Sequence, residues 1–133
     1  MKNKPILKGD ARQKLRSNQT QRNDYVPGFV YIVYSRKYKC YKIGLTRYMT
    51  ERYNQLSEIY ESLDFIICVE TNNMRQLELA MHRRYAKQRR YLDPSLNGFT
   101  EWFKFNLIKI IEVKLVLKIM CKWFDFLDFW DRL

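Results

Sequence analysis

The sequence predicts an α+β fold, an α/β sandwich in which a small antiparallel β-sheet is flanked by helices and a long helix ends the chain. Three observations support this prediction. Two adjacent segments are rich in β-branched and aromatic residues, later segments place apolar residues at helical spacing, and hydrophobic residues make up 47% of the 133 residues. A chain of this length and composition can bury one core without cross-links. We therefore expect one folded domain.

The first two strands are predicted from composition. Phe29–Ser35 (FVYIVYS) and Cys40–Thr46 (CYKIGLT) flank the short polar segment Arg36–Lys39, which is a β-hairpin signal. Pro27 and Gly28 precede the first strand and mark an abrupt change of composition. The folded domain should begin there.

A helix, a strand and a second helix should follow the hairpin. Thr50–Tyr60 carries apolar residues at helical spacing, with Thr50 available as its N-cap. Asp64–Glu70 (DFIICVE) has the composition of a strand, and Asn72 and Asn73 can cap a helix that runs through Tyr85. The expected order is ββαβα.

The last part of the chain should contain a loop, a short strand and a long helix. Asp93–Gly98 has loop composition, and Thr100–Phe105 (TEWFKF) fits one more short strand or edge segment. Asn106–Arg132 is helical in pattern and apolar over most of its circumference. Packing on the sheet, dimerisation and attachment to a membrane surface all remain open for this helix.

Charge divides the chain and predicts its partner. Residues 1–27 are expected to form a basic, flexible arm, residues 28–106 the main domain, and residues 107–133 an apolar helix that packs on the domain or on a partner. The net charge is +11 and the isoelectric point about 9.7, so nucleic acid or an anionic membrane is the expected partner class. The apolar stretch of the last helix is interrupted by lysines, so no membrane span is expected.

The cysteine pattern indicates where the protein works. Cys40, Cys68 and Cys121 are odd in number, far apart and set among apolar residues, which indicates neither a disulfide framework nor a metal knuckle. We expect free thiols in a reducing, intracellular compartment. That compartment is the cytoplasm, or the nucleus or a viral replication site if the source is a eukaryotic virus.

Five polar side chains can gather at the hairpin and its two helices. The eleven-residue offset between Tyr31 and Lys42 can put them opposite one another in the hairpin if the turn centres on Arg36 and Lys37. Arg52 falls in the first turn of the following helix. Glu78 and His82 are four residues apart and therefore stack on one face of the second helix.

Several short motifs occur in the order and spacing of a known family. They are Val30-Tyr31-Ile32, Lys42-Ile43-Gly44, Arg52, Leu77-Glu78 with His82, and Glu101-Trp102-Phe103. This pattern resembles the GIY-YIG nuclease superfamily, in particular the branch named after an open reading frame of phage T5. The resemblance covers about Gly28 to Asn106, and Lys42 stands where the family name has tyrosine.

The resemblance implies a metal-dependent endonuclease that cleaves nucleic acid, with DNA as the expected substrate and Mg²⁺ or Mn²⁺ as the cofactor. Glu78 would bind the metal ion, Arg52 would pair with the scissile phosphate, and Tyr31 would position or deprotonate the attacking water. Lys42 could stabilise the phenolate of Tyr31. His82 could act as a base, as an added ligand, or only as a helix residue. The alternative is a catalytically silent nucleic-acid-binding or assembly module on the same fold.

A run of cations in and after the second helix predicts the nucleic-acid surface. Its single sign of charge favours contacts to phosphates over a merely solvated helix face. The predicted contact residues are Arg47, Arg83, Arg84, Lys87, Arg89 and Arg90. A homodimer through the last helix is a further possible partner arrangement. The resemblance also suggests a phage, a large DNA virus or a mobile element as the source.

Overall fold

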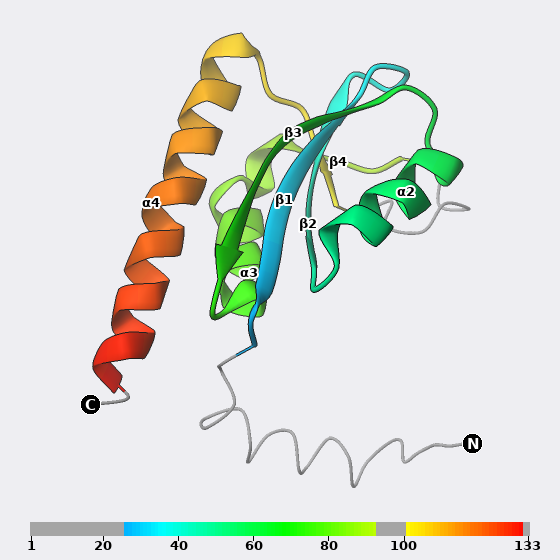
Figure 1. Cartoon of the computed structure of the whole chain (residues 1–133). Coiled ribbons are helices and arrows are strands. Elements are labelled where there is room, and N and C mark those ends of the chain that lie inside the picture. The colour runs from blue at the N-terminus through cyan, green and yellow to red at the C-terminus, as the bar shows by residue number, and fades with distance from the viewer. Residues whose placement is uncertain (1–25, 93–100, 132–133) are drawn as a thin grey trace, which may run out of the picture.

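The computed structural model describes residues 26–92 and 101–131. The predicted basic arm and the predicted loop Asp93–Gly98 lie outside these residues, apart from Val26 and Pro27 at the end of the arm. In the described part of the chain, five strands form one sheet in the order β3-β1-β2-β5-β4, and every pair of neighbours is antiparallel. Helices cover both faces of this sheet (Figure 1). The predicted α+β class is confirmed.

The hairpin forms as predicted. β1 spans Gly28–Ser35 and β2 spans Cys40–Thr46. Tyr31 pairs with Gly44, and Lys42 pairs with Val33, so the prediction that Tyr31 and Lys42 lie opposite one another is wrong. The turn occupies Arg36–Lys39 as expected, but its centre lies one residue beyond Arg36 and Lys37: Ser35 pairs with Cys40, and Lys39 closes the turn with a positive φ of 56°. Tyr31 and Lys42 nevertheless share a face, because each strand alternates with period two.

The remaining strands complete the sheet on both sides of the hairpin. β3, Leu63–Thr71, pairs with β1, and β5, Trp102–Phe103, pairs with Tyr41 and Lys42 of β2. The outermost strand on the β5 side is β4, Arg89–Arg90. β5 is therefore an inner strand. The sequence analysis missed β4, because two consecutive arginines have no apolar alternation.

Within residues 26–92 and 101–131, three α-helices flank the sheet. α2 is Met49–Ile59, α3 is Met74–Arg84 and α4 is Leu107–Asp131, with a short 3₁₀ helix η1 at Ala86–Gln88. The expected N-cap Thr50 is wrong: Tyr48 occupies that position, and its N–H donates to Thr46 Oγ1 at 3.1 Å. Asn73 is the N-cap of α3 but makes no capping bond through its side chain.

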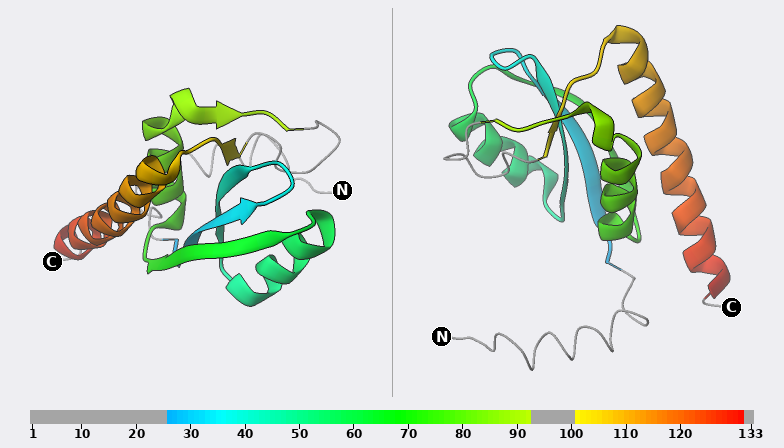
Figure 2. Two further views of the ribbon diagram at one scale, coloured as in Figure 1. Left: turned by 90° about the horizontal axis from the view of Figure 1, so that it is seen from above. Right: turned by 180° about the vertical axis from the view of Figure 1, so that it is seen from behind.

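The two faces of the sheet have separate cores. On one face, α3 and α4 pack on Val30, Ile32 and Ile43. On the other face, Leu56 of α2 and Tyr60 just after it pack with Tyr31, Val33 and Trp102. Figure 2 shows α4 and α2 on opposite sides of the strands.

The long helix α4 packs on β3 and α3. Its buried residues are Ile110, Val113, Leu117 and Cys121. Asp125 Oδ1 accepts hydrogen bonds from Thr71 Oγ1 at 2.8 Å and from the Asn72 N–H at 2.9 Å. Of the uses that the sequence left open, packing on the sheet is confirmed for one side of this helix. None of the helices in the described part of the chain is long and apolar enough to cross a membrane.

Candidate active site

Tyr31 and Gly44 form the floor of the site. They are directly opposite one another in the hairpin, on the face that α2 covers. A Cβ atom at Gly44 would lie 2.5 Å from Tyr31 Cζ, which is too close unless the tyrosine ring moves. Gly44 therefore lets the tyrosine ring lie across β2, and this explains why the strand carries a glycine there.

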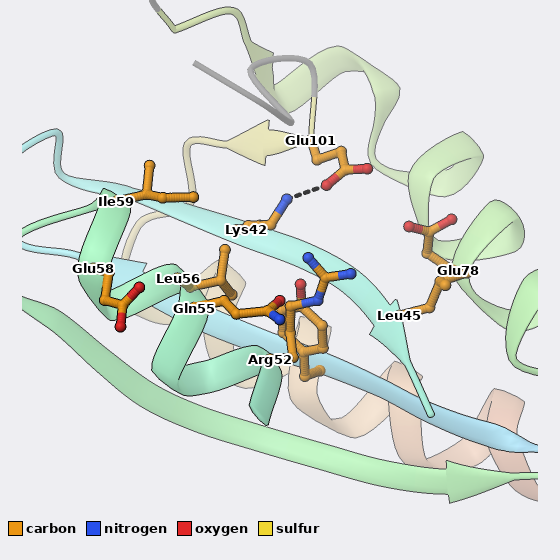
Figure 3. A pocket seen from close by; sticks show the side chains of 10 residues that line it. Lys42, Leu45, Arg52, Gln55, Leu56, Glu58, Ile59, Glu78 and Glu101 are labelled. Atoms are coloured by element: carbon orange, nitrogen blue, oxygen red, sulfur yellow. Dashed lines mark hydrogen bonds and ion pairs between the residues drawn. The ribbon is translucent and has the colours of Figure 1, made fainter. Parts of the chain in front are cut away.

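Arg52 reaches the site from α2. It is in the first turn of this helix, where its N–H donates to the Tyr48 carbonyl oxygen at 3.0 Å. Figure 3 shows its guanidinium extending from α2 toward the space between Lys42 and Glu78. Burial raises the pKa of Tyr31, and the positive charge of Arg52 opposes that rise in part. Arg52 is thus the cation that favours the Tyr31 phenolate, the part the sequence analysis gave to Lys42.

Glu78 enters from α3, around the open edge of β2. β5 pairs with β2 only at Tyr41 and Lys42, and the Ile43 N–H donates to the Glu101 carbonyl oxygen at 3.2 Å, so α3 approaches the β2 edge just beyond these contacts. Burial and the charge of Glu101 raise the pKa of Glu78 to about 7, although Lys42, Arg75 and Arg89 act in the opposite direction. A cation beside this carboxyl group would favour its ionised form.

His82 fixes α3 to that edge. Its Nε2 donates to the Ile43 carbonyl oxygen at 2.8 Å, and its Nδ1 accepts from the Arg89 guanidinium at 3.2 Å. Arginine can only donate, so the ring is the neutral Nε2–H tautomer. Burial lowers its pKa. Both ring nitrogens are hydrogen-bonded and His82 does not line the cleft. These contacts favour a structural role in the helix over a role as a base or a metal ligand.

Lys42 is buried and paired with Glu101. Only 3% of the lysine is exposed, and its Nζ forms an ion pair with Glu101 Oε1 and lies 5.9 Å from the centre of the Trp102 ring. A buried ammonium needs such a partner. The sequence analysis quoted Glu101 within a motif but did not place it in the site. The unexplained charge of Lys42 in an apolar strand was the signal that a carboxylate had to lie nearby.

These residues surround one cleft of about 480 Å³ that opens to solvent. Tyr31, Arg52 and Glu78 converge on it from β1, α2 and α3. Figure 3 shows Arg52 and Glu78 around it together with Lys42 and Glu101. The sequence analysis missed the other lining residues, which come mainly from α2. They are Leu45, Gln55, Leu56, Glu58 and Ile59.

The cleft offers few ligands of its own for a metal ion. Within residues 26–92 and 101–131, no group of three or more His, Cys, Asp or Glu side chains could hold one. Mg²⁺, however, is commonly bound by one or two carboxylates together with water and substrate phosphates. Glu78, with a raised pKa and a solvent-open cleft before it, fits that kind of site. Glu58 and Glu101 are the other carboxylates that line the cleft.

Most of the predicted phosphate contacts are exposed. Arg47 follows β2, and the other exposed cations lie at the end of α3 and beyond it: Arg83, Arg84, Lys87 and Arg90. Arg89 differs from them. It is half-buried, with its guanidinium on His82 and 5.6 Å from the centre of the Phe103 ring. These contacts indicate that Arg89 supports the fold and is not one of the exposed cations available to phosphates.

The fold and the cleft define a small, basic α+β protein in which a phenol, a guanidinium and a carboxyl group meet at one solvent-open site. A family model described as the T5orf172 domain matches residues 28–123, and the chain belongs to this family. The match begins at Gly28, where the sequence analysis placed the domain boundary, and includes most of α4 as well. No curated protein and no solved structure matches the chain.

Proposed function

We propose that this protein is a metal-dependent endonuclease that hydrolyses phosphodiester bonds in nucleic acid, with DNA as its substrate. The observation that carries the proposal is the convergence of Tyr31, Arg52 and Glu78 on one open cleft. These are the three residues that the resemblance to the GIY-YIG superfamily assigns to catalysis. Membership of the T5orf172 domain family is consistent with it.

Arg52 and Tyr31 divide the work of binding and positioning. The guanidinium of Arg52 presents a planar set of donors that matches two oxygens of a phosphate. Burial raises the pKa of Tyr31, so its hydroxyl group is protonated at neutral pH. In that form it orients the attacking water or a phosphate oxygen by hydrogen bonding. Lys42, already paired with Glu101, holds that carboxylate in place at the cleft.

Glu78 would hold the metal ion. Its carboxyl group has a pKa of about 7, so a cation is needed to keep it fully ionised at neutral pH. Bound Mg²⁺ or Mn²⁺ would neutralise charge on the phosphate and the leaving oxygen. The chain's own contribution is the carboxylate, its burial beside the sheet edge, and the fixed orientation that His82 gives to α3.

The test is nicking of supercoiled plasmid DNA by the purified full chain with Mg²⁺ or Mn²⁺. We expect nicking by the wild type, and a loss on the order of 10³-fold in Glu78→Gln, the scale of removing a group that stabilises transition-state charge. Glu51→Gln, which changes an exposed carboxylate beside Arg52, is the matched control and should nick normally. Equal nicking by the wild type and Glu78→Gln would reject the proposal.

The scarcity of metal ligands favours a second candidate. In the described part of the chain three carboxylates line the cleft, Glu58, Glu78 and Glu101, and one oxygen of Glu101 is engaged by Lys42. A catalytically silent module that binds nucleic acid or supports assembly would keep the fold and the basic surface without needing the metal. It predicts salt-sensitive DNA binding and no nicking above that of Glu78→Gln.

A further inference from the structure

The outward side of α4 is apolar along nearly its whole length. Large hydrophobic side chains recur there every three or four residues, which places them in one row along a helix. We call this row the outer stripe. It consists of Ile108, Ile111, Leu115, Ile119, Trp123, Phe126 and Trp130.

The outer stripe lies opposite the side that packs on the domain. Ile110, Val113, Leu117 and Cys121 are buried against β3 and α3, and a helical period of 3.6 residues puts them about half a turn away from the stripe. Figures 1 and 2 show α4 at one side of the molecule with no other element beyond it. Whatever covers the stripe must come from outside the described part of the chain.

The stripe is large enough for a stable interface. Its side chains are between 52% and 81% exposed, and a fully covered aromatic side chain alone buries roughly 150–250 Å². Together they present on the order of 900 Å², against about 800 Å² per partner in an interface of standard size. The rings are also ordered against one another, with centroids 6.0 Å apart for Trp123 and Phe126 and 6.4 Å apart for Phe126 and Trp130. Isolated surface residues do not account for a patch of this extent.

The order of side-chain sizes along the stripe indicates what covers it. The first half is aliphatic, from Ile108 to Ile119, and the second half is aromatic, from Trp123 to Trp130. Two copies packed antiparallel about Ile119 would place large side chains against small ones, with Leu115 facing Trp123 and Ile108 facing Trp130. Such alternation lets layers interdigitate, and antiparallel helices also set opposite ends of their dipoles side by side.

We propose that a second copy of this chain covers the outer stripe, with the two α4 helices antiparallel in a two-fold symmetric dimer. A single self-complementary patch is what such symmetry requires. The cleft lies on the α2 face of the sheet and α4 on the other, so the two clefts of the dimer face away from each other. If the proposed nuclease function holds, one dimer acts on two separate segments of nucleic acid and nicks each of them.

Sedimentation velocity of the full chain without nucleic acid tests the dimer independently of any nuclease activity. We expect a monomer–dimer equilibrium whose dissociation constant rises at least ten-fold in Ile119→Asp. Leu79→Asp, which changes an exposed apolar residue of α3, is the matched control and should leave that constant unchanged. Unaltered circular dichroism shows that both variants fold. A wild type that stays monomeric at about 100 µM, or an Ile119→Asp variant that dimerises normally, overturns the proposal.

Two further experiments test the orientation of the two helices and the alternative that a lipid surface covers the outer stripe. Under mild oxidation, Ile119→Cys should cross-link to itself because it lies at the two-fold axis, whereas Ile108→Cys should not exceed the wild type. Equal cross-linking of both variants would mean parallel helices and overturn the antiparallel pairing. A monomeric chain that floats with vesicles of phosphatidylcholine and phosphatidylserine would assign the stripe to a lipid surface instead.

Discussion

The two faces of the sheet are built from the same strands and both have an apolar core, but only the face under α2 also holds the charged groups of the cleft. Along β1, Val30 and Ile32 point into the apolar core under α3 and α4, while Tyr31 between them lines the cleft. Along β2, Ile43 enters that core and Lys42 faces the cleft. The face under α3 and α4 therefore provides the larger apolar core, and the other face combines a smaller core with polar groups in a partly desolvated site where charges interact strongly.

The charged groups that disfavour folding and most of the apolar burial that favours it therefore lie on different faces of the sheet. The cleft face carries a buried ammonium and a carboxyl group with a raised pKa, both of which disfavour folding unless they are compensated. The face under α3 and α4, the core face, has few buried polar groups that need a partner. It stabilises the fold through apolar burial. Substitutions on the cleft face should mainly change chemistry, and those on the core face should mainly change folding.

The sharpest test of the cleft face is Arg52→Ala. Removing the guanidinium should lower DNA nicking on the order of 10³-fold, about 4 kcal/mol, because Arg52 is the only cation of α2. Arg52→Lys should recover only part of the rate, since an ammonium lacks the planar fork. Plasmid nicking under single-turnover conditions measures both. Thermal unfolding should change little, and a large drop in Tm would assign Arg52 to the core instead.

The matching test of the core face is Leu117→Ala. This side chain is fully buried between α4 and the sheet, and its truncation should destabilise the protein by about 2–5 kcal/mol in urea unfolding. Leu79→Ala, at an exposed position of α3, should cost less than about 0.5 kcal/mol. At low temperature, where both variants are folded, the nicking rate per folded molecule should equal that of the wild type. A loss of rate comparable with that of Arg52→Ala would show that the two faces are not separable.

The pH dependence of stability should reveal the cost of Glu78. Its pKa is raised from 4.5 to about 7, so its contribution is fully present below pH 4.5 and is lost as the pH rises through 7. In chelator, the free energy of unfolding of the wild type should therefore fall relative to that of Glu78→Gln between pH 5 and 8. The relative loss should be roughly 2–3 kcal/mol for a side chain that is 19% exposed. A difference that is flat with pH would mean that the carboxyl group is solvated.

Mg²⁺ provides the control for that measurement. An ion bound at Glu78 should restore stability at pH 8 and have little effect at pH 5, where the carboxyl group is protonated. Glu78→Gln should show no such shift in Tm at either pH. An equal shift in the wild type and the variant would place the ion elsewhere.

A smaller effect is expected from Gly44→Ala. Gly44 of β2 pairs with Tyr31 of β1, whose ring lines the cleft. The added methyl group would meet the Tyr31 ring, so the ring must move or the strands must separate. We expect a loss of about 1–3 kcal/mol of stability from overpacking and a lower nicking rate with unchanged DNA affinity. Combining Gly44→Ala with Tyr31→Phe should add little to the rate loss of either. Additive rate losses would show that Gly44 and Tyr31 affect the rate independently.

The sequence predicted the fold better than it predicted the polar contacts of the site. Alternation in Phe29–Ser35 and Cys40–Thr46 determines which residues face the cleft, so Tyr31 and Lys42 were placed on the same face even though their register was wrong. The register depends on where the turn is centred, and Lys39 with a positive φ carries no glycine or asparagine signal. Periodicity survives such an error because a shift of two residues leaves the face unchanged.

Contacts between distant segments could not be predicted in the same way. The pairing of Lys42 with Glu101 depends on β5 reaching β2, and a two-residue strand has too little pattern to place it. His82 shows the same limit. Its spacing from Glu78 suggested a shared active-site role, but its ring bonds to the Ile43 carbonyl oxygen, a backbone group that side-chain patterns do not register.

The weakest expected effect lies outside both faces, at the exposed cations beyond the cleft. Lys87→Ala should weaken DNA binding by less than about 1 kcal/mol and reduce the slope of log affinity against log salt by about one, the signature of one lost phosphate contact. Fluorescence anisotropy in chelator measures this without cleavage. Lys37→Ala, in the turn of the hairpin, is the matched control and should leave the slope unchanged. Equal slopes for Lys87→Ala and the wild type would show that phosphates are held at the cleft alone, since exposed charges separated from bound DNA by more than about 8–10 Å are largely screened at physiological salt.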